Sequence, residues 1–223
     1  MLKRMTYLLF LLLLCLYPVS SSLANAEIKE QKNQMLENKD YTVYKQFKGM
    51  EKSYAGPLPW EKNKDFKKVL SDNHTPIRMA AYKATLHDPL MSEAYNIGLA
   101  AQQLCGTVVK PGETFSQNET IGPYTRERGY QEGPTYAGNK ITTTVGGGVC
   151  KIASLLYNVV TLSDLPVVMR DSHSMLVPYV PPGQDATVYY GVRDFRFLNN
   201  LDAPILIWAQ KVDNTLYLSL IHI

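Results

Sequence analysis

The sequence has few of the residue types that dominate site chemistry, with three cysteines and four histidines among 223 residues. Cysteine and histidine do not recur at the close spacing of a zinc site, which argues against a bound metal. The triple glycine at 146–148 lacks the lysine and serine or threonine that continue a phosphate-binding P-loop. No internal repeat or low-complexity tract occurs. We therefore expect neither a metal nor another cofactor.

The sequence also lacks a large excess of either basic or acidic residues. The formal net charge is +3, and Lys3 and Arg4 at the N-terminus supply two of those charges. Without them the chain is close to +1, whereas nucleic-acid-binding domains carry a marked basic surface. We expect no nucleic-acid partner and no strong attraction to an anionic surface.

Long hydrophobic runs are missing as well, and the apolar stretch from Leu8 to Leu16 is too short to span a bilayer comfortably. Lys3 and Arg4 precede this stretch, and Ala24-Asn25-Ala26 follows it. That order predicts a secretory signal peptide over residues 1–26, cleaved after Ala26. We expect a secreted, extracytoplasmic protein, attached to a membrane only through an uncleaved signal peptide.

Two cysteines remain after such cleavage, Cys105 and Cys150. Exported proteins often pair their cysteines, so a disulfide between them is one interpretation. The other is two separate thiols, because Cys105 falls at the end of a predicted helix that Gly106 terminates. The sequence does not provide the Cα separation that decides between them.

Hydrophobic periodicity predicts an α+β fold in which two principal helices pack against a mostly antiparallel sheet. The first helix starts from Asp88-Pro89 as N-cap and first helical position and ends at Gly106. The second begins at Cys150. Strand patterns occur at 77–86, 108–109, 142–145, 165–170, 175–180, 185–190, 194–198, 204–209 and 215–220.

Three regions are expected along the chain. Residues 1–26 form the signal peptide, and residues 27–73 form a polar leader or linker of unassigned fold, a loop-rich N-terminal extension with scattered aromatic residues. Residues 74–223 form the folded domain.

The most informative motif is Gly146-Gly147-Gly148-Val149-Cys150, which leads directly into the second helix. A thiol in the first turn of a helix faces unpaired amides and the positive end of the dipole, and both favour the nucleophilic thiolate. Glycines just before it allow another molecule to approach the backbone closely. Cysteine is also a common buried residue, so packing alone is the competing interpretation.

Further sequence blocks stand in order along the chain: Pro111-Gly112-Glu113-Thr114-Phe115-Ser116, Arg128-Gly129-Tyr130, Gly146 to Cys150, Leu156-Tyr157-Asn158, His173-Ser174, Tyr179-Val180-Pro181-Pro182-Gly183, Asp185-Ala186-Thr187-Val188 and Asp194-Phe195-Arg196-Phe197. Together these blocks resemble the VanW family, named for an accessory protein of glycopeptide-resistance clusters. The resemblance runs from about residue 77 to 220. It implies an exported Gram-positive cell-envelope protein linked to peptidoglycan. That family's cysteine is usually followed by glutamine, whereas Lys151 stands there in this chain.

A candidate catalytic set follows from chain order: Cys150, then His173, then Asp185 or Asp194. Transglutaminase-like thiol enzymes use this order, in which a base activates the thiol and a carboxylate orients the base. We expect sulfur and imidazole within hydrogen-bond reach, with Asp185 as first choice for the third member. Its alternative role is to cap a turn.

Further residues are candidates for substrate contacts. Backbone N–H groups of the turn formed by Gly146, Gly147 and Gly148 are candidate oxyanion donors. Ser174, next to His173, is a second candidate for a substrate contact. Arg128 either holds a substrate carboxylate or forms an exposed ion pair.

Two classes of function fit these patterns. One is a thiol-dependent hydrolase or acyltransferase that acts on peptidoglycan or its precursors. The other is a non-catalytic peptidoglycan-binding or scaffold protein, accessory to glycopeptide resistance or wall maintenance. Thiol reactivity discriminates them, because only the first needs an activated cysteine.

Overall fold

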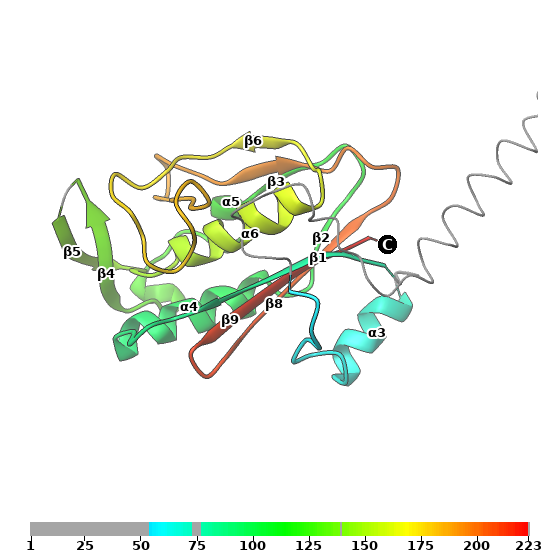
Figure 1. The fold of residues 1–223 in the computed structure, drawn as a ribbon, viewed down its shortest axis with the longest axis horizontal. Coiled ribbons are helices and arrows are strands. Elements are labelled where there is room, and N and C mark those ends of the chain that lie inside the picture. Colours follow the sequence, from blue (N-terminus) through cyan, green and yellow to red (C-terminus); the bar gives the residue numbers. More distant parts are fainter. Residues whose placement is uncertain (1–53, 73–76, 139, 223) are drawn as a thin grey trace, which may run out of the picture. The chain divides into compact units, whose positions relative to one another are not determined.

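A four-stranded antiparallel sheet with the order β1–β9–β8–β2 organises the domain. The computed structural model describes residues 54–72, 77–138 and 140–222. Within them, helices and antiparallel strands combine as the expected α+β fold, so this prediction is confirmed. Figure 1 shows the strands of this sheet, β1 (Ile77–Thr85), β2 (Thr107–Val109), β8 (Ile205–Val212) and β9 (Thr215–His222).

Two helices, α4 (Met91–Leu104) and α6 (Cys150–Leu162), pack on one face of the sheet. α4 contacts β8, and α6 contacts β1 and β9. Leu155, Leu156 and Val159 of α6 are fully buried in this core, as the helical spacing of its apolar residues predicts. The first residue of α6 is thereby fixed against the sheet, which matters because that residue is Cys150.

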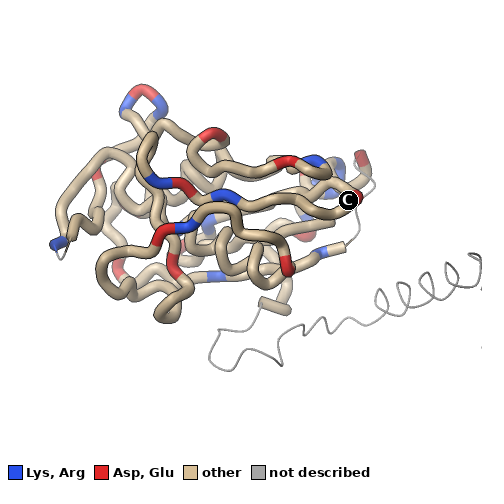
Figure 2. The backbone as a smooth tube through the Cα atoms, turned by 90° about the horizontal axis from the view of Figure 1, so that it is seen from above, with Lys and Arg blue, Asp and Glu red and all other residues tan. Residues whose placement is uncertain are grey.

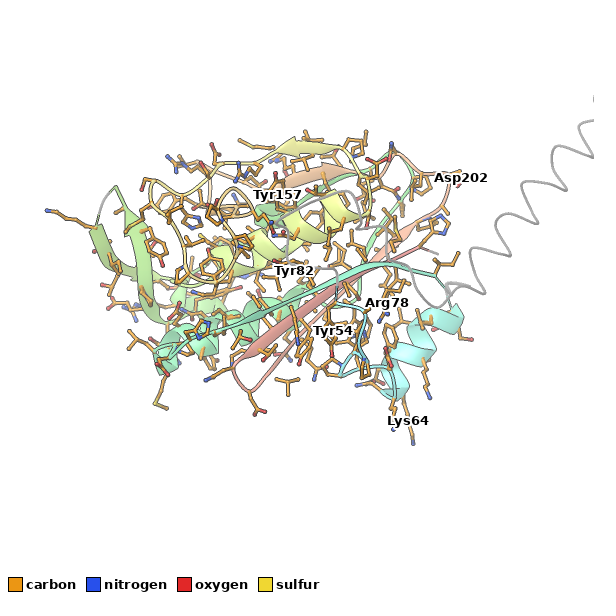
Figure 3. All side chains as sticks on the ribbon, viewed as in Figure 1. Tyr54, Lys64, Arg78, Tyr82, Tyr157 and Asp202 are labelled. Atoms are coloured by element: carbon orange, nitrogen blue, oxygen red, sulfur yellow. The ribbon has the colours of Figure 1, made fainter. Side chains whose placement is uncertain are left out.

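The other face of the sheet is also buried, by residues 54–72 with helix α3 (Lys64–Asp72). Strand β8 shows why both faces need cover: Leu206 and Trp208 point to this side, while neighbouring residues point to the helices. Trp60 and Phe66 pack against Trp208 and its neighbours. Figure 3 shows Tyr54 in this region, where its ring meets Tyr217 edge-on. Part of the predicted N-terminal extension thus packs against the sheet.

Smaller elements frame the rest of the domain. Figure 1 shows one hairpin beside α4 and a three-stranded sheet beyond α6. The hairpin consists of β4 (Glu132–Ala137) and β5 (Lys140–Val145). The three-stranded sheet has the order β3 (Thr114–Ser116), β7 (Arg196–Leu198), β6 (Val167–Met169). A short helix, α5 (Gln117–Ile121), and a 3₁₀ turn, Arg126–Arg128, join the two.

The predicted start of the first helix is wrong by two residues. Asp88 does not cap α4, because its φ of 42° places it in the left-handed region, which aspartate tolerates in turns. The N-cap is Leu90, and no side chain satisfies the first amides there. Pro89 therefore lies in the turn rather than at the first helical position.

Two predicted strands, at 175–180 and 185–190, are also wrong. Residues 175–180 form no strand, and residues 185–190 contribute only two isolated bridges, Asp171 to Thr187 and Tyr189 to Arg193. The alternation of 185–190 arises because one side of the segment faces α6. Its backbone partners include helix side chains rather than a neighbouring strand.

The predicted signal peptide lies outside the described residues. Among the residues that the structure describes, no helix is both long and apolar enough to cross a membrane. Figure 2 shows basic and acidic residues interspersed along this part of the chain, without a broad surface of one sign.

Candidate functional site

Cys150 is the first residue of α6 and stands at the end of the glycine turn. The helix has Val149 as its N-cap, whose side chain offers no hydrogen bond to the first turn. The amides of Lys151 and Ile152 donate to the carbonyls of Gly148 and Val149, so the Cys150 amide and the helix dipole supply the positive potential beside the thiol. The structure places the sulfur where the sequence motif predicts it.

The glycine turn is shaped by a close backbone approach to the β4–β5 hairpin. A Cβ atom built on Gly147 would lie 2.1 Å from the carbonyl carbon and oxygen of Gly133. Gly133 in turn would place a Cβ 2.7 Å from the carbonyl oxygen of Gly147. These two glycines face each other with no room for a side chain on either.

Asn96 of α4 ties the same turn to the hairpin. Its Nδ2 donates to the carbonyl oxygens of Gln131 (2.8 Å) and Gly147 (2.9 Å), and its Oδ1 accepts from the Gln131 amide at 2.8 Å. The side chain is fully buried. One asparagine therefore sets the distance between α4, the hairpin and the residues that precede Cys150.

Two amides of the turn remain available as oxyanion donors. Gly146, Gly147 and Val149 each donate their N–H to a backbone carbonyl. In the described residues, the amides of Gly148 and Cys150 have no such acceptor. Of the three predicted glycine donors, only Gly148 is free for the role, and the Cys150 amide joins it. Backbone N–H groups without an acceptor are the kind of donor that stabilises the oxyanion of a tetrahedral intermediate.

A polar stripe on α6 fixes the segment 184–188 beside the thiol. Cys150, Ser154 and Asn158 lie four residues apart on one face of the helix. Ser154 Oγ accepts from the Ala186 amide at 2.9 Å, and Asn158 Nδ2 donates to the Gln184 carbonyl at 2.8 Å. The first member of the stripe is the candidate nucleophile, so the segment that the other two hold is its wall.

The sulfur has two neighbours on this wall. Thr187 Oγ1 lies 3.4 Å from Sγ, and the Val188 amide donates toward Sγ at 3.5 Å. Both are hydrogen-bond donors to the negative form of sulfur, so both favour thiolate. The Val188 carbonyl oxygen, also 3.5 Å from Sγ, accepts from the protonated thiol instead.

Asp185 fixes the orientation of His173. Its Oδ2 lies 2.7 Å from the ring Nδ1 and also accepts from the His173 amide at 2.7 Å. Arg170 holds Asp185 from the other side, since its Nε donates to the Asp185 carbonyl at 2.8 Å and its Nη2 to Oδ1 at 3.2 Å. The remaining ring nitrogen, Nε2, is buried and has no hydrogen-bond partner of standard geometry in the described part of the chain.

The thiol and the imidazole lie close enough to shift each other's pKa. Burial alone raises the pKa of the Cys150 thiol, but the proton and charge of His173 and the Thr187 hydroxyl bring it below its ordinary value. Burial lowers the pKa of His173, yet Cys150 and then Asp185 raise it above its ordinary value. The two shifts together favour a thiolate–imidazolium pair. No hydrogen bond joins the two groups within the described residues, since His173 Nε2 has no partner, and such bonds often tighten only when substrate is bound.

Asp194 lies apart from this group. Its buried carboxylate accepts from Ser116 Oγ (2.6 Å), from Arg196 Nε (2.8 Å) and from the amides of Asn118 (2.9 Å) and Phe195 (2.8 Å). These bonds join β3, α5 and the residues before β7. Of the two aspartates that the sequence left open, the structure brings Asp185 to His173.

Arg128 and Ser174 are engaged in loop contacts. Arg128 Nη1 donates to the Gly122 carbonyl at 2.6 Å, and Ser174 Oγ donates to the Gly138 carbonyl at the tip of the β4–β5 hairpin. Ser174 thereby ties the hairpin to the loop that carries His173. Neither residue lines the two cavities described next.

Two cavities meet at the thiol. The first, about 200 Å³, is lined by Glu93, Lys151, Tyr136, Ile141, Pro178 and Tyr179, among others. The second, about 240 Å³, is lined by the glycine turn with Tyr124, Tyr189 and Tyr190. Cys150, Gly148 and Thr135 border both. A substrate lying across the thiol would thus have one part in each cavity.

Both cysteines are free thiols, so the alternative of a Cys105–Cys150 disulfide does not hold in this structure. Cys105 packs against the Trp60 and Phe66 side of the sheet, and Cys150 belongs to the opposite core. Burial raises the pKa of Cys105, the reverse of the shift at Cys150. Within the described residues, no group of three or more metal-binding side chains gathers.

Comparison with known proteins identifies the family. A profile described as "VanW like protein" matches residues 92–221, more than half of the chain. The chain belongs to the VanW-like family. The match contains Cys150, His173 and Asp185 but not the N-terminal residues that cover the sheet.

Two curated relatives are similar over the same region. The "Uncharacterized protein YoaR" of Bacillus subtilis (strain 168) is 40% identical over 143 residues, 64% of this chain and 47% of that protein. The "Vancomycin B-type resistance protein VanW" of Enterococcus faecalis (strain ATCC 700802 / V583) is 33% identical over 128 residues, 55% of this chain and 46% of that protein. The matched region spans about half the length of each relative. No solved structure matches the chain.

Sequence analysis of this VanW-like domain missed three polar residues that shape the site: Glu93, Asn96 and Arg170. Glu93 and Asn96 are buried on the face of α4 that includes Ile97. Polar residues on an otherwise apolar helical face were the available signal. Arg170 gave no such signal, because its partner Asp185 lies across an irregular segment.

Proposed function

We propose that this VanW-like protein is an exported thiol enzyme that cleaves or transfers acyl groups at amide bonds of peptidoglycan or its precursors. The observation that carries the proposal is Cys150 at a helix start, electrostatically coupled to His173, whose Nδ1 is held by Asp185 at 2.7 Å. This combination of nucleophile, base and orienting carboxylate is the arrangement used in acyl transfer.

The chemistry proceeds in two halves. The Cys150 thiolate attacks the amide carbonyl carbon, and the negative charge on oxygen faces the amides of Gly148 and Cys150. His173 transfers its proton from Nε2 to the departing nitrogen, the C–N bond breaks and a thioester remains on sulfur. Water or an acceptor amine then loses a proton to His173 and attacks the thioester, which restores the thiolate.

The cell-envelope setting is supported by two observations. Residues 1–26 have the charged, apolar and small-residue order of a signal peptide. One relative carries the name of a vancomycin resistance protein, and the family resemblance implies peptidoglycan as a partner. Sequencing the N-terminus of the exported protein should give Glu27 as the first residue. Soluble cytoplasmic protein that retains Met1 would refute export.

Thiol reactivity tests the enzymatic part of the proposal. Iodoacetamide should alkylate Cys150 near neutral pH at least about tenfold faster than Cys105, since only Cys150 has a lowered pKa. Peptide mapping by mass spectrometry measures both rates in one sample. The C150S variant should lose any release of peptide or amino acid from purified peptidoglycan while keeping its fold.

Equal inertness of the two cysteines would overturn the enzymatic proposal. Cys150 would then be a packed thiol whose contacts with Thr187 and Val188 only stabilise the fold. The protein would be a non-catalytic wall-binding or scaffold protein, the second function class that the sequence allows.

A further inference from the structure

Lys151 occupies a place that local physics disfavours. It is the second residue of α6, where the helix dipole repels a cation. Its side chain is only 12% exposed, and its Nζ forms an ion pair with Glu93, whose side chain is 11% exposed. A buried ion pair contributes little net stability, because both charges give up their hydration. The fold alone therefore does not account for this lysine.

The ion pair lies in the wall of the first cavity, next to the thiol. Lys151, Glu93, Cys150 and Gly148 line that cavity together. The Lys151 ammonium also lies 4.7 Å from the centre of the Tyr179 ring. An ammonium has three N–H donors, and one bond to Glu93 with one aromatic contact leaves donor capacity for a ligand.

His173 indicates which part of a substrate enters this cavity. The rings of Tyr136 and Tyr179 lie 5.3 Å and 6.4 Å from the His173 ring, centre to centre. Both tyrosines line the first cavity, and neither lines the second. Since the general acid protonates the leaving nitrogen, the leaving group belongs on this side. The acyl part then extends into the second cavity, along the glycine turn.

We propose that Lys151 is a specificity-determining residue that binds a carboxylate on the leaving group, so that the favoured substrate is the last amide bond of a peptide with a free C-terminus. The proposal rests on the thiol mechanism proposed above. In that reaction the C–N bond breaks, the nitrogen takes the proton from His173, and an amino acid with a free carboxylate departs. Glu93 holds the ammonium in place when the cavity is empty and faces the other charge of a bound amino acid.

Two alkylating agents that differ only in this carboxylate provide the test: N-iodoacetylglycine and N-iodoacetylglycinamide. Each gives Cys150 a thioether by displacing iodide, and each places its glycine carboxyl or amide one residue beyond the reacting carbon. The rate of the acid divided by the rate of the amide should be roughly tenfold higher at Cys150 than at Cys105. Cys105 serves as the reference within the same molecule.

Variants of the ion pair should move that ratio in opposite directions. K151M and K151Q should lower it to the value at Cys105. E93Q should raise it, because the remaining cation is no longer offset. The control K140M removes an exposed lysine of the nearby β4–β5 hairpin and should leave the ratio unchanged.

The outcomes separate this inference from the proposed function. A ratio that K151M does not lower, with Cys150 still reactive toward the amide reagent, overturns the carboxylate site and leaves the thiol enzyme standing. Inertness of Cys150 toward both reagents overturns the proposed function itself. E93Q guards against misfolding as an explanation, since loss of structure cannot raise the ratio.

Discussion

Arg170 positions His173 indirectly, through Asp185. It touches neither the thiol nor the cavities, yet two of its bonds fix Asp185, and Asp185 fixes the ring. Its guanidinium also lies 4.8 Å from the centre of the Tyr157 ring, and Figure 3 shows Tyr157 on α6. It is a positioning residue that joins the histidine loop to the helix of the nucleophile.

Replacing Arg170 should therefore weaken the interaction between Cys150 and His173 rather than abolish it. We expect R170M to slow alkylation of Cys150 at pH 7 about three- to tenfold, because the hydrogen bonds that position Asp185, and through it the His173 ring, are lost. R170K should recover part of the rate, since it restores a cation without the two-pronged geometry. Rates of Cys105 in the same samples are the control, and an unchanged Cys150 rate in R170M would contradict the positioning role.

The pH dependence of alkylation reports on the thiolate. Since the pKa of Cys150 lies below its ordinary value of 9.0, the rate should reach half of its maximum below pH 9. In H173Q the cation is gone and burial remains, so the midpoint should move above pH 9. D185N should fall between, because the pKa of His173 loses a contribution that raises it. A midpoint in H173Q equal to that of the wild type would exclude coupling of the two residues.

The sequence predicts the nucleophile more readily than its partners. A cysteine after three glycines at a helix start is a local pattern, visible within a few residues. The choice between Asp185 and Asp194 depends on how residues 184–188 are held against α6 by Ser154 and Asn158. Such a contact between side chain and distant backbone has no periodicity that a sequence pattern could show.

At the scale of elements, the contact through which Asn96 joins α4 to the hairpin and the glycine turn is one whose loss should strongly lower stability. N96A should lower the free energy of unfolding by about 2–4 kcal/mol, since it leaves the Gln131 amide and two carbonyls without their partner. Urea denaturation measures the change. Q102A, at an exposed position of the same helix, is the control and should change stability by less than about 0.5 kcal/mol.

Regular elements followed from the sequence because their patterns are local. The spacing of apolar residues predicted α6, and alternation predicted the strands of the main sheet. The two wrongly predicted strands lie between residues 171 and 195, where the chain is ordered by bonds to α6, to Arg170 and to Asn118 rather than by a strand ladder. The start of α4 failed for a related reason, since a left-handed Asp88 separates the turn from the helix.

At the scale of the whole molecule, the family match leaves out the N-terminal part of the packed domain. It begins at residue 92, yet β1 pairs with β9 along its length, and residues 54–72 cover the outer face of the sheet. A chain trimmed to the match would lose an edge strand and expose Trp208 and its neighbours. The fold of residues 54–72 could not be predicted from the sequence, because their aromatic residues have no regular spacing.

The packing of residues 54–72 on the sheet should contribute a large share of the free energy of unfolding. F66A should lower the free energy of unfolding by about 3–5 kcal/mol, since the ring packs 4.8 Å from Trp208 in a buried cluster. Thermal unfolding followed by tryptophan fluorescence detects the loss. Val69 lies beside the same cluster, and V69A should cost less, because fewer buried methyl groups are removed. Equal stability of F66A and the wild type would show that the segment is dispensable.

The face-to-face glycines of the turn and the hairpin also have a consequence for how this protein can vary. A side chain at Gly133 or at Gly147 collides with the backbone of the other, and a second substitution cannot relieve a collision that the first makes with main-chain atoms. No stepwise route of single exchanges therefore leads away from this pair. In a library of random variants, both positions should be depleted as strongly as Cys150, although neither contributes a reacting group, and that depletion should persist when selection acts on abundance alone.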